Sequence, residues 1–120
     1  MRREEYITKS QQYALVYNEG SSWANSLIVM KALPNWLALT KYGFSVGKRV
    51  GKAVTRNRVK RLLREILRLI PLKPGWDIIF IVRTGAANAN YTTLKKSVEA
   101  LLFRAQLLAE EYEGICLKVN

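Results

Sequence analysis

The sequence predicts an α+β domain in which a small sheet is covered by helices, and three observations lead to this prediction. Apolar residues recur at helical spacing in three separate stretches, and the segments between them are rich in β-branched and aromatic residues. The elements follow as helix, two or three strands, helix, strand and helix, without a repeat or a linker. With 120 residues, 49% of them hydrophobic, we expect a single domain over residues 1–120.

The first half of the chain predicts one helix followed by strands. Residues 9–19 have aromatic and aliphatic side chains at helical spacing and end before a glycine, which indicates a short helix. Residues 23–33 and 36–46 are predicted as strands, and the Pro-Asn pair between them is typical of a turn. The glycine-containing stretch 47–55 is predicted as a loop that leads into the next helix.

The second half predicts a helix, a buried strand and a closing helix. Residues from about 53 to 70 have a strong helical pattern that two prolines end. Residues 76–83 form a nearly continuous apolar run, as expected for a central strand. Residues 91–112 place leucines and a valine on one stripe, with Asn90 as the predicted N-cap. The tail after residue 113 is too short to assign.

The positive charge of the chain is concentrated in one segment. Twenty Lys and Arg residues against nine Asp and Glu give a formal net charge of +11. Between Lys41 and Arg68 lie ten basic residues and one acid, Glu65, so this segment alone carries +9. Such a field attracts polyanions, and neutralising their phosphates releases counterions. We therefore expect a nucleic acid as the partner, with a solvated basic face or a membrane-surface helix as the alternatives.

The composition excludes several classes of chemistry. The chain has no histidine, so it has no Ser-His-Asp or Cys-His nucleophile and no HExxH metal site. Its one cysteine, Cys116, can form neither an intramolecular disulfide nor a Cys-rich zinc site, and a lone thiol fits a reducing compartment. The apolar runs are far shorter than the ~20 residues that span a bilayer, and residues 1–19 lack the apolar stretch of a signal peptide. We expect a cytoplasmic protein without a membrane partner.

The helix after Thr55 has an apolar face and a basic face on a helical wheel. The apolar side carries Val59, Leu62, Leu63, Ile66, Leu67, Leu69 and Ile70. The opposite side carries Asn57, Lys60, Arg61, Arg64 and Arg68, with Arg56 and Arg58 at the two flanks of the first turn. We expect the apolar side to dock on the core. The basic side and the N-terminal amides then favour phosphate binding, with a solvated face as the alternative.

Other patterns narrow the type of nucleic acid. No short helix precedes the basic helix across a tight turn, so a helix-turn-helix is not predicted and DNA is not the expected partner. Tyr13 and Tyr17 lie one helical turn apart and are candidates for stacking on unpaired bases, with core packing as the equal alternative. No glycine motif for nucleotides and no carboxylate pair near the basic face is present. The three tryptophans are expected in the core or at its rim: Trp23, Trp36 and Trp76.

Residues 41–67, KYGFSVGKRVGKAVTRNRVKRLLREIL, resemble the signature of the bacterial ribonuclease P protein family. That signature is a strand ending in G-x-S-V, a basic linker K-[KR]-x-G-x-A-V, and R-N-R-x-K-R-x-x-R-E on a helix. The matching residues here are Gly43, Ser45, Val46, Lys48, Arg49, Gly51, Ala53, Val54, Arg56, Asn57, Arg58, Lys60, Arg61, Arg64 and Glu65. The resemblance extends less tightly to the first helix, the DIIFIVR strand and the closing helix.

The resemblance implies a two-layer α+β sandwich with the order helix, three strands, helix, strand, helix and a left-handed βαβ crossover. Periodicity alone would not predict this handedness, because such crossovers are almost always right-handed. The resemblance also implies that the partners are ribonuclease P RNA and precursor tRNA. The RNA subunit would cleave the precursor at the mature 5′ end with Mg²⁺ that is bound mainly by RNA, and the protein would have no catalytic or metal-binding residue.

The resemblance further implies two sets of RNA-binding residues. The 5′ leader of the precursor would contact Tyr13, Tyr17, Ser45, Asn57, Lys60, Arg61 and Arg64. The catalytic RNA would contact Lys48, Arg49, Lys52, Arg56, Arg58 and Arg68. Where relatives often have an aromatic residue at the end of the first strand, this chain has Met30-Lys31, so its leader preference is expected to differ. The alternative function is a ribosomal or other structured-RNA-binding protein that serves no enzyme.

Overall fold

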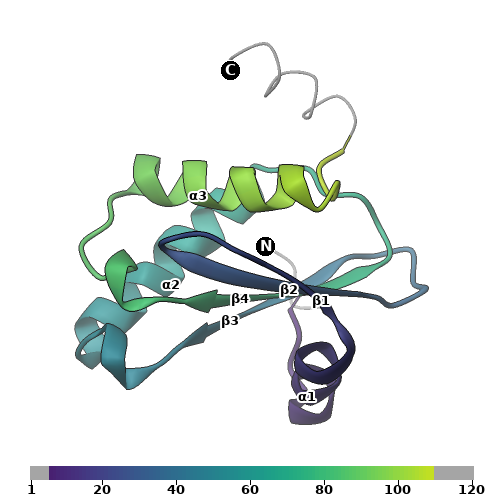
Figure 1. Ribbon diagram of the computed structural model, residues 1–120, viewed down its shortest axis with the longest axis horizontal. Coiled ribbons are helices and arrows are strands. Elements are labelled where there is room, and N and C mark those ends of the chain that lie inside the picture. Colours follow the sequence, from purple (N-terminus) through teal and green to yellow (C-terminus); the bar gives the residue numbers. More distant parts are fainter. Residues whose placement is uncertain (1–5, 110–120) are drawn as a thin grey trace.

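The computed structural model describes residues 6–109, in which helices lie on both faces of one four-stranded sheet (Figure 1). The predicted order is confirmed, with three strands before the second helix. The elements are α1 (Ser10–Glu19), β1 (Ser21–Ala24), β2 (Ile28–Pro34), β3 (Lys41–Val46), the 3-10 helix η2 (Lys48–Val50), α2 (Ala53–Arg68), β4 (Trp76–Val82), the 3-10 helix η3 (Thr84–Ala86) and α3 (Tyr91–Arg104).

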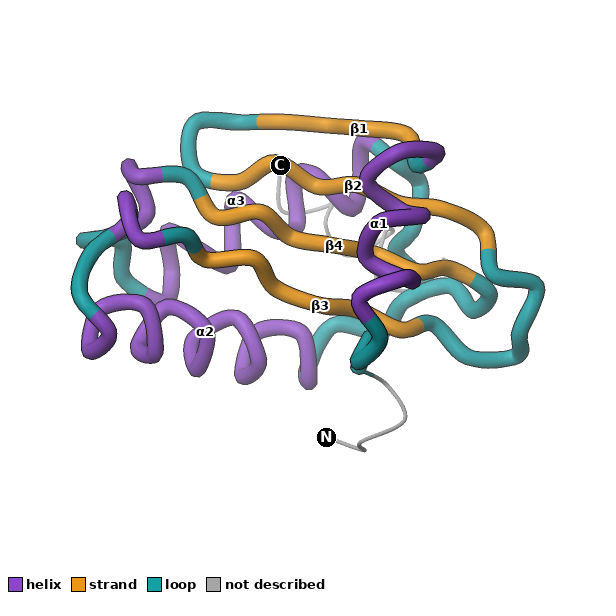
Figure 2. Tube along the Cα trace, turned by 90° about the horizontal axis from the view of Figure 1, so that it is seen from below, coloured by secondary structure: helices purple, strands orange, loops and turns teal. Residues whose placement is uncertain are grey.

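The strands are arranged in the order β1-β2-β4-β3. β1 pairs antiparallel with β2, and β2 pairs antiparallel with β4, whereas β3 pairs parallel with β4. β4 is therefore a central strand, as its apolar run predicts, and Ile78, Ile79 and Phe80 are fully buried. The connection from β3 through α2 to β4 passes over one face of the sheet and is left-handed, as the resemblance implies (Figures 1 and 2).

The main core lies between the sheet and the pair α2 and α3. Alternate strand residues face this layer because successive side chains of a strand point to opposite faces. Phe80 and Met30 from the sheet are fully buried there, together with Leu63 from α2 and Leu101 from α3. Among the described elements, α1 alone covers the other face, where a second, smaller cluster is formed by Ile7, Val16 and Ile79.

Two predicted strands are shorter than expected. The predicted strand 23–33 is two strands, because the Asn25 side chain accepts hydrogen bonds from the amides of Leu27 and Ile28 and turns the chain between β1 and β2. The predicted strand 36–46 begins only at Lys41. Residues 36–40 form a turn instead, in which Trp36 has a φ of 59° that no strand residue adopts.

The two long helices also end earlier than predicted. α2 ends at Arg68, so Leu69, expected on the apolar side, is 63% exposed. α3 begins as predicted, with the Asn90 side chain accepting a hydrogen bond from the Thr93 amide at 2.9 Å.

The end of α3 is set by tertiary contacts. Gln106 adopts a φ of 60°, and the chain then turns back toward the core. The Lys73 amide donates to the Leu107 carbonyl at 2.8 Å, and Leu107 and Leu108 are buried. The prediction of a helix up to residue 112 is therefore wrong over residues 105–109. Residues 110–112, Cys116 and the tail lie outside the described residues. Within residues 6–109, no helix is long and apolar enough to cross a bilayer.

Candidate nucleic-acid interface

Part of the sheet face that carries α1 is left open. α1 crosses the sheet, and the sheet stays visible beyond it toward the C-terminal ends of β3 and β4 (Figure 2). The strand register places Ser45, Ile81 and Val29 in one row across this part of the sheet, and all three are half-buried. We call this surface, together with Tyr17 and Lys31 beside it, the open face.

Tyr13 lies at the boundary between α1 and the edge strand β3. Its hydroxyl group lies directly over Gly43, where a Cβ would overlap with the Tyr13 oxygen. Burial raises the pKa of Tyr13 above its ordinary value, while a backbone hydrogen bond with Phe44 acts in the lowering direction. Tyr13 packs against the small cluster under α1 and is only partly exposed. Tyr13 therefore packs against the core, as one sequence alternative predicted, and it also keeps part of its surface exposed. Whether it stacks on an unpaired base stays a prediction.

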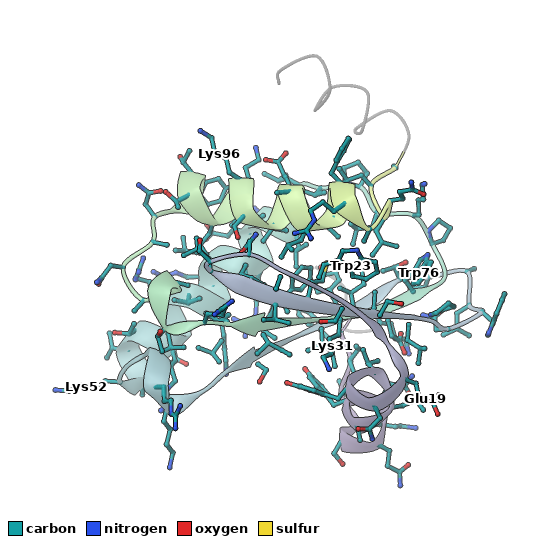
Figure 3. All side chains as sticks on the ribbon, in the orientation of Figure 1. Glu19, Trp23, Lys31, Lys52, Trp76 and Lys96 are labelled. Carbon is teal, nitrogen blue, oxygen red and sulfur yellow. The ribbon has the colours of Figure 1, made fainter. Side chains whose placement is uncertain are left out.

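Tyr17 and Lys31 form a second contact between α1 and the sheet. The Lys31 ammonium donates a hydrogen bond to the Tyr17 carbonyl at 2.9 Å and lies 5.4 Å from the centroid of the Tyr17 ring. Figure 3 shows Lys31 between the sheet and α1. Met30, its neighbour, is fully buried on the opposite face. The position where relatives often have an aromatic residue thus brings a cation to the open face.

Lys31 was not among the predicted leader-binding residues, although the sequence contains a signal for its place on the open face. In β2 the burial alternates, with Ile28, Met30 and Ala32 buried on the helix-covered side. A lysine between buried residues of a strand has to point to the other face. The period of two therefore places Lys31 on the face that α1 only partly covers.

The basic side of α2 is accessible along the edge of the sheet. α2 runs beside β3 in Figure 2. The wheel prediction is confirmed for Val59, Leu63, Ile66 and Leu67, which are buried, and is wrong for the exposed Leu69. The polar side carries Asn57, Arg61, Arg64 and Arg68, which are exposed, and Lys60, which is half-buried.

The loop before α2 adds charge at the positive end of the helix dipole. Lys48, Arg49 and Lys52 are all exposed. The N-cap residue of α2 is Lys52, whose side chain makes no capping hydrogen bond within the described residues. The first amides of α2 are therefore left among cations, which is an arrangement that favours phosphate oxygens.

Arg56 and Arg58 differ from the other basic residues of α2. The Arg58 guanidinium donates hydrogen bonds to the Ala87 carbonyl at 2.7 Å and to the Ala89 carbonyl at 3.3 Å. It thereby ties α2 to the segment that precedes α3. Arg56 is half-buried, and its Nε atom has no hydrogen-bond partner within the described residues. The sequence predicted Arg58 only as an RNA contact, and its structural role depends on carbonyl groups about thirty residues away.

The residues predicted to bind the leader and those predicted to bind the catalytic RNA come from different parts of the fold. Of the leader set, Tyr17 and Ser45 belong to the open face, Tyr13 lies between α1 and β3, and the remaining members lie on α2. Of the catalytic-RNA set, Lys48, Arg49 and Lys52 precede α2, and Arg56, Arg58 and Arg68 lie on it. Which RNA each set contacts stays a prediction. In residues 6–109, no group of three or more His, Cys, Asp or Glu side chains could hold a metal ion.

A family model described as Ribonuclease P matches residues 1–106, which is most of the chain. The chain belongs to the ribonuclease P protein family. The ribonuclease P protein component of Dehalococcoides mccartyi is 44% identical over 120 residues, and the match covers both chains completely. That of Caldanaerobacter subterraneus is 44% identical over 107 residues, covering 88% of this chain and 92% of the relative.

Solved structures of ribonuclease P proteins confirm the fold. The Staphylococcus aureus protein is 30% identical with a TM-score of 0.80, covering 88% of this chain and 98% of that one. The Thermotoga maritima protein is 30% identical with a TM-score of 0.74, covering 83% and 96%. RNA binding is typical of this family of ribonuclease P subunits, and membership supports a role in tRNA processing by ribonuclease P. Family membership therefore accounts for the basic segment without a role as a ribosomal protein or as a membrane-surface helix.

Proposed function

We propose that this ribonuclease P subunit holds the single-stranded 5′ leader of precursor tRNA on the open face while the partner RNA cleaves the precursor. The protein would increase affinity for the precursor over the mature tRNA, because only the precursor has a leader. Family membership supports the association with ribonuclease P RNA. The leader itself, the location of catalysis and a cytoplasmic setting are parts of the proposal.

One observation carries the proposal: a half-buried apolar floor adjoins an aromatic ring and cations on the same side of the sheet. Ile81 and Val29 form the floor, and Tyr17 with Lys31 forms the wall under α1. Bases pack on such apolar and aromatic surfaces only when they are unpaired, since a duplex hides their faces. Phosphates of the same strand would reach Arg61 and Arg64 on the adjoining helix.

We assign the loop before α2 and the flanks of its first turn to ribonuclease P RNA. Lys48, Arg49 and Lys52 of this surface are exposed, and the Lys52 side chain does not cap the first amides of α2. None of the assigned residues is aromatic, so the surface suits a phosphate backbone rather than unstacked bases. The residues assigned there are Lys48, Arg49, Lys52, Arg56 and Arg58. Arg68, at the opposite end of α2, is assigned to the same RNA.

Catalysis is assigned to the RNA, together with most of the bound Mg²⁺. The chain has no histidine to act as a general base near neutral pH. The acid nearest to the basic side of α2 in the sequence is Glu65, a single exposed carboxylate. The side chains of this subunit thus supply binding and orientation to the proposed reaction.

The proposal is tested with the reconstituted complex of this protein and a bacterial ribonuclease P RNA. Cleavage of a precursor tRNA at low Mg²⁺ should require the protein, and precursor should bind more tightly than mature tRNA. Lys31→Ala should reduce that preference, because it removes a cation from the open face. Lys96→Ala is the matched control, since Lys96 is exposed on the far side of α3 (Figure 3). Equal affinity of the wild-type complex for precursor and mature tRNA would show that the leader assignment is wrong.

A further inference from the structure

A second surface with binding features lies on the other flank of α1. A pocket of about 350 Å³ opens there between α1 and the turn that joins β2 to β3. Of the five exposed large hydrophobic side chains in the described residues, three line this pocket: Leu15, Trp36 and Leu37. Gln12 and Leu15 belong to the flank of α1 that faces away from Tyr17, so α1 separates the pocket from the open face.

The turn that bears Trp36 is built on a buried carboxylate. Asp77 of β4 is 1% exposed, and it accepts hydrogen bonds from the side-chain amides of Gln12 in α1 and Asn35 in the turn. The Asn35 side chain also accepts a hydrogen bond from the Leu37 amide at 2.8 Å. Asp77 therefore ties α1, the turn and the sheet together and gives the pocket a fixed shape.

Trp36 is held in an unusual backbone conformation with its ring in solvent. Its φ of 59° is an outlier for a bulky residue, and such strain persists only where the surrounding structure fixes it. The side chain is 91% exposed, which is contrary to its predicted place in the core or at its rim. Trp23 and Trp76, in contrast, are half-buried against the core as predicted (Figure 3). The exposed ring contributes little packing, so its position is available to a ligand.

The charges around the pocket select the class of ligand. Lys9 and Lys41 line it, and among its described lining residues Asp77 is the sole acid, buried and hydrogen-bonded. An exposed indole beside ammonium groups suits an unpaired nucleotide, whose base stacks on the ring and whose phosphate contacts a lysine. A second copy of this chain would bring the same lysines and a net charge of +11 to the contact, and the two copies would repel each other.

We propose that this pocket binds an unpaired nucleotide of the 5′ leader, farther from the tRNA than the part that lies over the open face. The inference rests on the proposed function. In Figure 2, α1 lies between the C-terminal ends of β3 and β4 and the turn that joins β2 to β3. Because that turn and α1 line the pocket, a strand that continues from the open face across α1 reaches the pocket next.

The test compares two precursor tRNAs, one with a leader that ends over the open face and one with a leader several nucleotides longer. Trp36→Gly removes the ring and suits a positive φ, so the fold should be kept. In the complex with ribonuclease P RNA, this variant should lose affinity for the longer precursor by on the order of tenfold and leave the shorter one unchanged. Trp36→Phe should restore most of the loss. Leu69→Ala, an exposed apolar side chain outside the pocket, is the matched control and should change neither affinity.

Several outcomes would overturn the proposal. The proposal is wrong if Trp36→Gly weakens the binding of both precursors equally, of neither precursor, or of ribonuclease P RNA alone. A concentration-dependent dimer that Trp36→Gly dissociates would assign the pocket to a second copy. Each of these results leaves the wild-type preference for precursor over mature tRNA intact. Loss of that preference in the wild-type complex would instead contradict the proposed function.

Discussion

The two faces of the sheet differ in what their side chains do. On the face toward α2 and α3, Phe80, Met30 and Leu63 are fully buried in a continuous apolar core. On the face toward α1, only a small cluster is sealed, and the rest presents Ser45, Lys31 and half-buried aliphatic side chains. The difference teaches that one face supplies most of the stability, so the other can keep apolar surface accessible for a ligand.

The largest effect is expected from a substitution on the sealed face. Phe80→Ala should lower the free energy of unfolding by about 3–5 kcal/mol, because it removes a buried ring and leaves a cavity. Denaturant unfolding followed by circular dichroism measures this change. Val29→Ala on the open face is the control and should cost far less, since Val29 is only half-buried. Similar costs at the two positions would contradict the division of roles between the faces.

Substitutions of two arginines of α2 should have different effects, one on the free energy of unfolding and the other on the affinity for precursor tRNA. Arg58→Ala leaves the Ala87 and Ala89 carbonyls without a donor and should lower the free energy of unfolding by about 1–3 kcal/mol. Arg61→Ala should leave stability nearly unchanged, because Arg61 is exposed. It should instead weaken precursor binding and reduce the slope of log affinity against log salt by about one.

Unfolding and salt-titrated binding are measured on both arginine variants, with Lys96→Ala as a charge-matched control on α3. A loss of affinity for mature tRNA equal to the loss for precursor would show that Arg61 does not contact the leader. An unchanged unfolding free energy in Arg58→Ala would show that its hydrogen bonds to the loop contribute nothing.

Gly43→Ala tests the contact that joins α1 to the sheet. The added Cβ would overlap the Tyr13 hydroxyl, so Tyr13 has to move. We expect a cost of about 1–3 kcal/mol in unfolding free energy and a lower affinity for precursor. The double variant Gly43→Ala with Tyr13→Phe removes the hydroxyl and should recover part of the stability. If the double variant is no more stable than Gly43→Ala alone, the overlap with the Tyr13 hydroxyl is not the cause of the destabilisation.

The smallest expected effect is on the pH dependence of stability, through the titration of Tyr13. Its pKa is raised in the folded protein, so the folded state keeps the proton longer than the unfolded state does. This contribution to stability is complete below about pH 10, the ordinary pKa of tyrosine, and is lost as the pH rises through the folded pKa. Stability of the wild type should therefore fall more steeply above pH 10 than that of Tyr13→Phe. Parallel curves would contradict a raised pKa.

The sequence predicted the type and order of the elements because periodicity is local. The alternation of apolar and basic residues in α2 placed both faces of that helix correctly, and Asn90 marked the start of α3. The ends of the elements depend on contacts between distant residues. The turn at Trp36 needs Asp77, and the turn at Gln106 needs the backbone of Lys73. No local pattern contains that information.

The sequence also predicted the exposure of the candidate interface residues better than it predicted their structural contacts. The signature residues and the helical wheel identified the exposed cations of α2 without any knowledge of tertiary structure. The role of Arg58 in holding the loop before α3 could not be predicted, because the carbonyls of Ala87 and Ala89 carry no side-chain signal. The left-handed crossover came from the resemblance alone, since general rules favour the other hand.

The parallel pairing of β3 has a consequence for the order of folding. β1 and β2 are neighbours in the sequence and can pair as a local hairpin, whereas the one strand of the described sheet that pairs with β3 is β4, which follows it across the whole of α2. Contacts of such sequence separation form late, because a long loop has to close first. During synthesis, the row of the open face that includes Ser45 and Ile81 cannot assemble until β4 has emerged. The protein therefore completes its central strand and its open face in the same step.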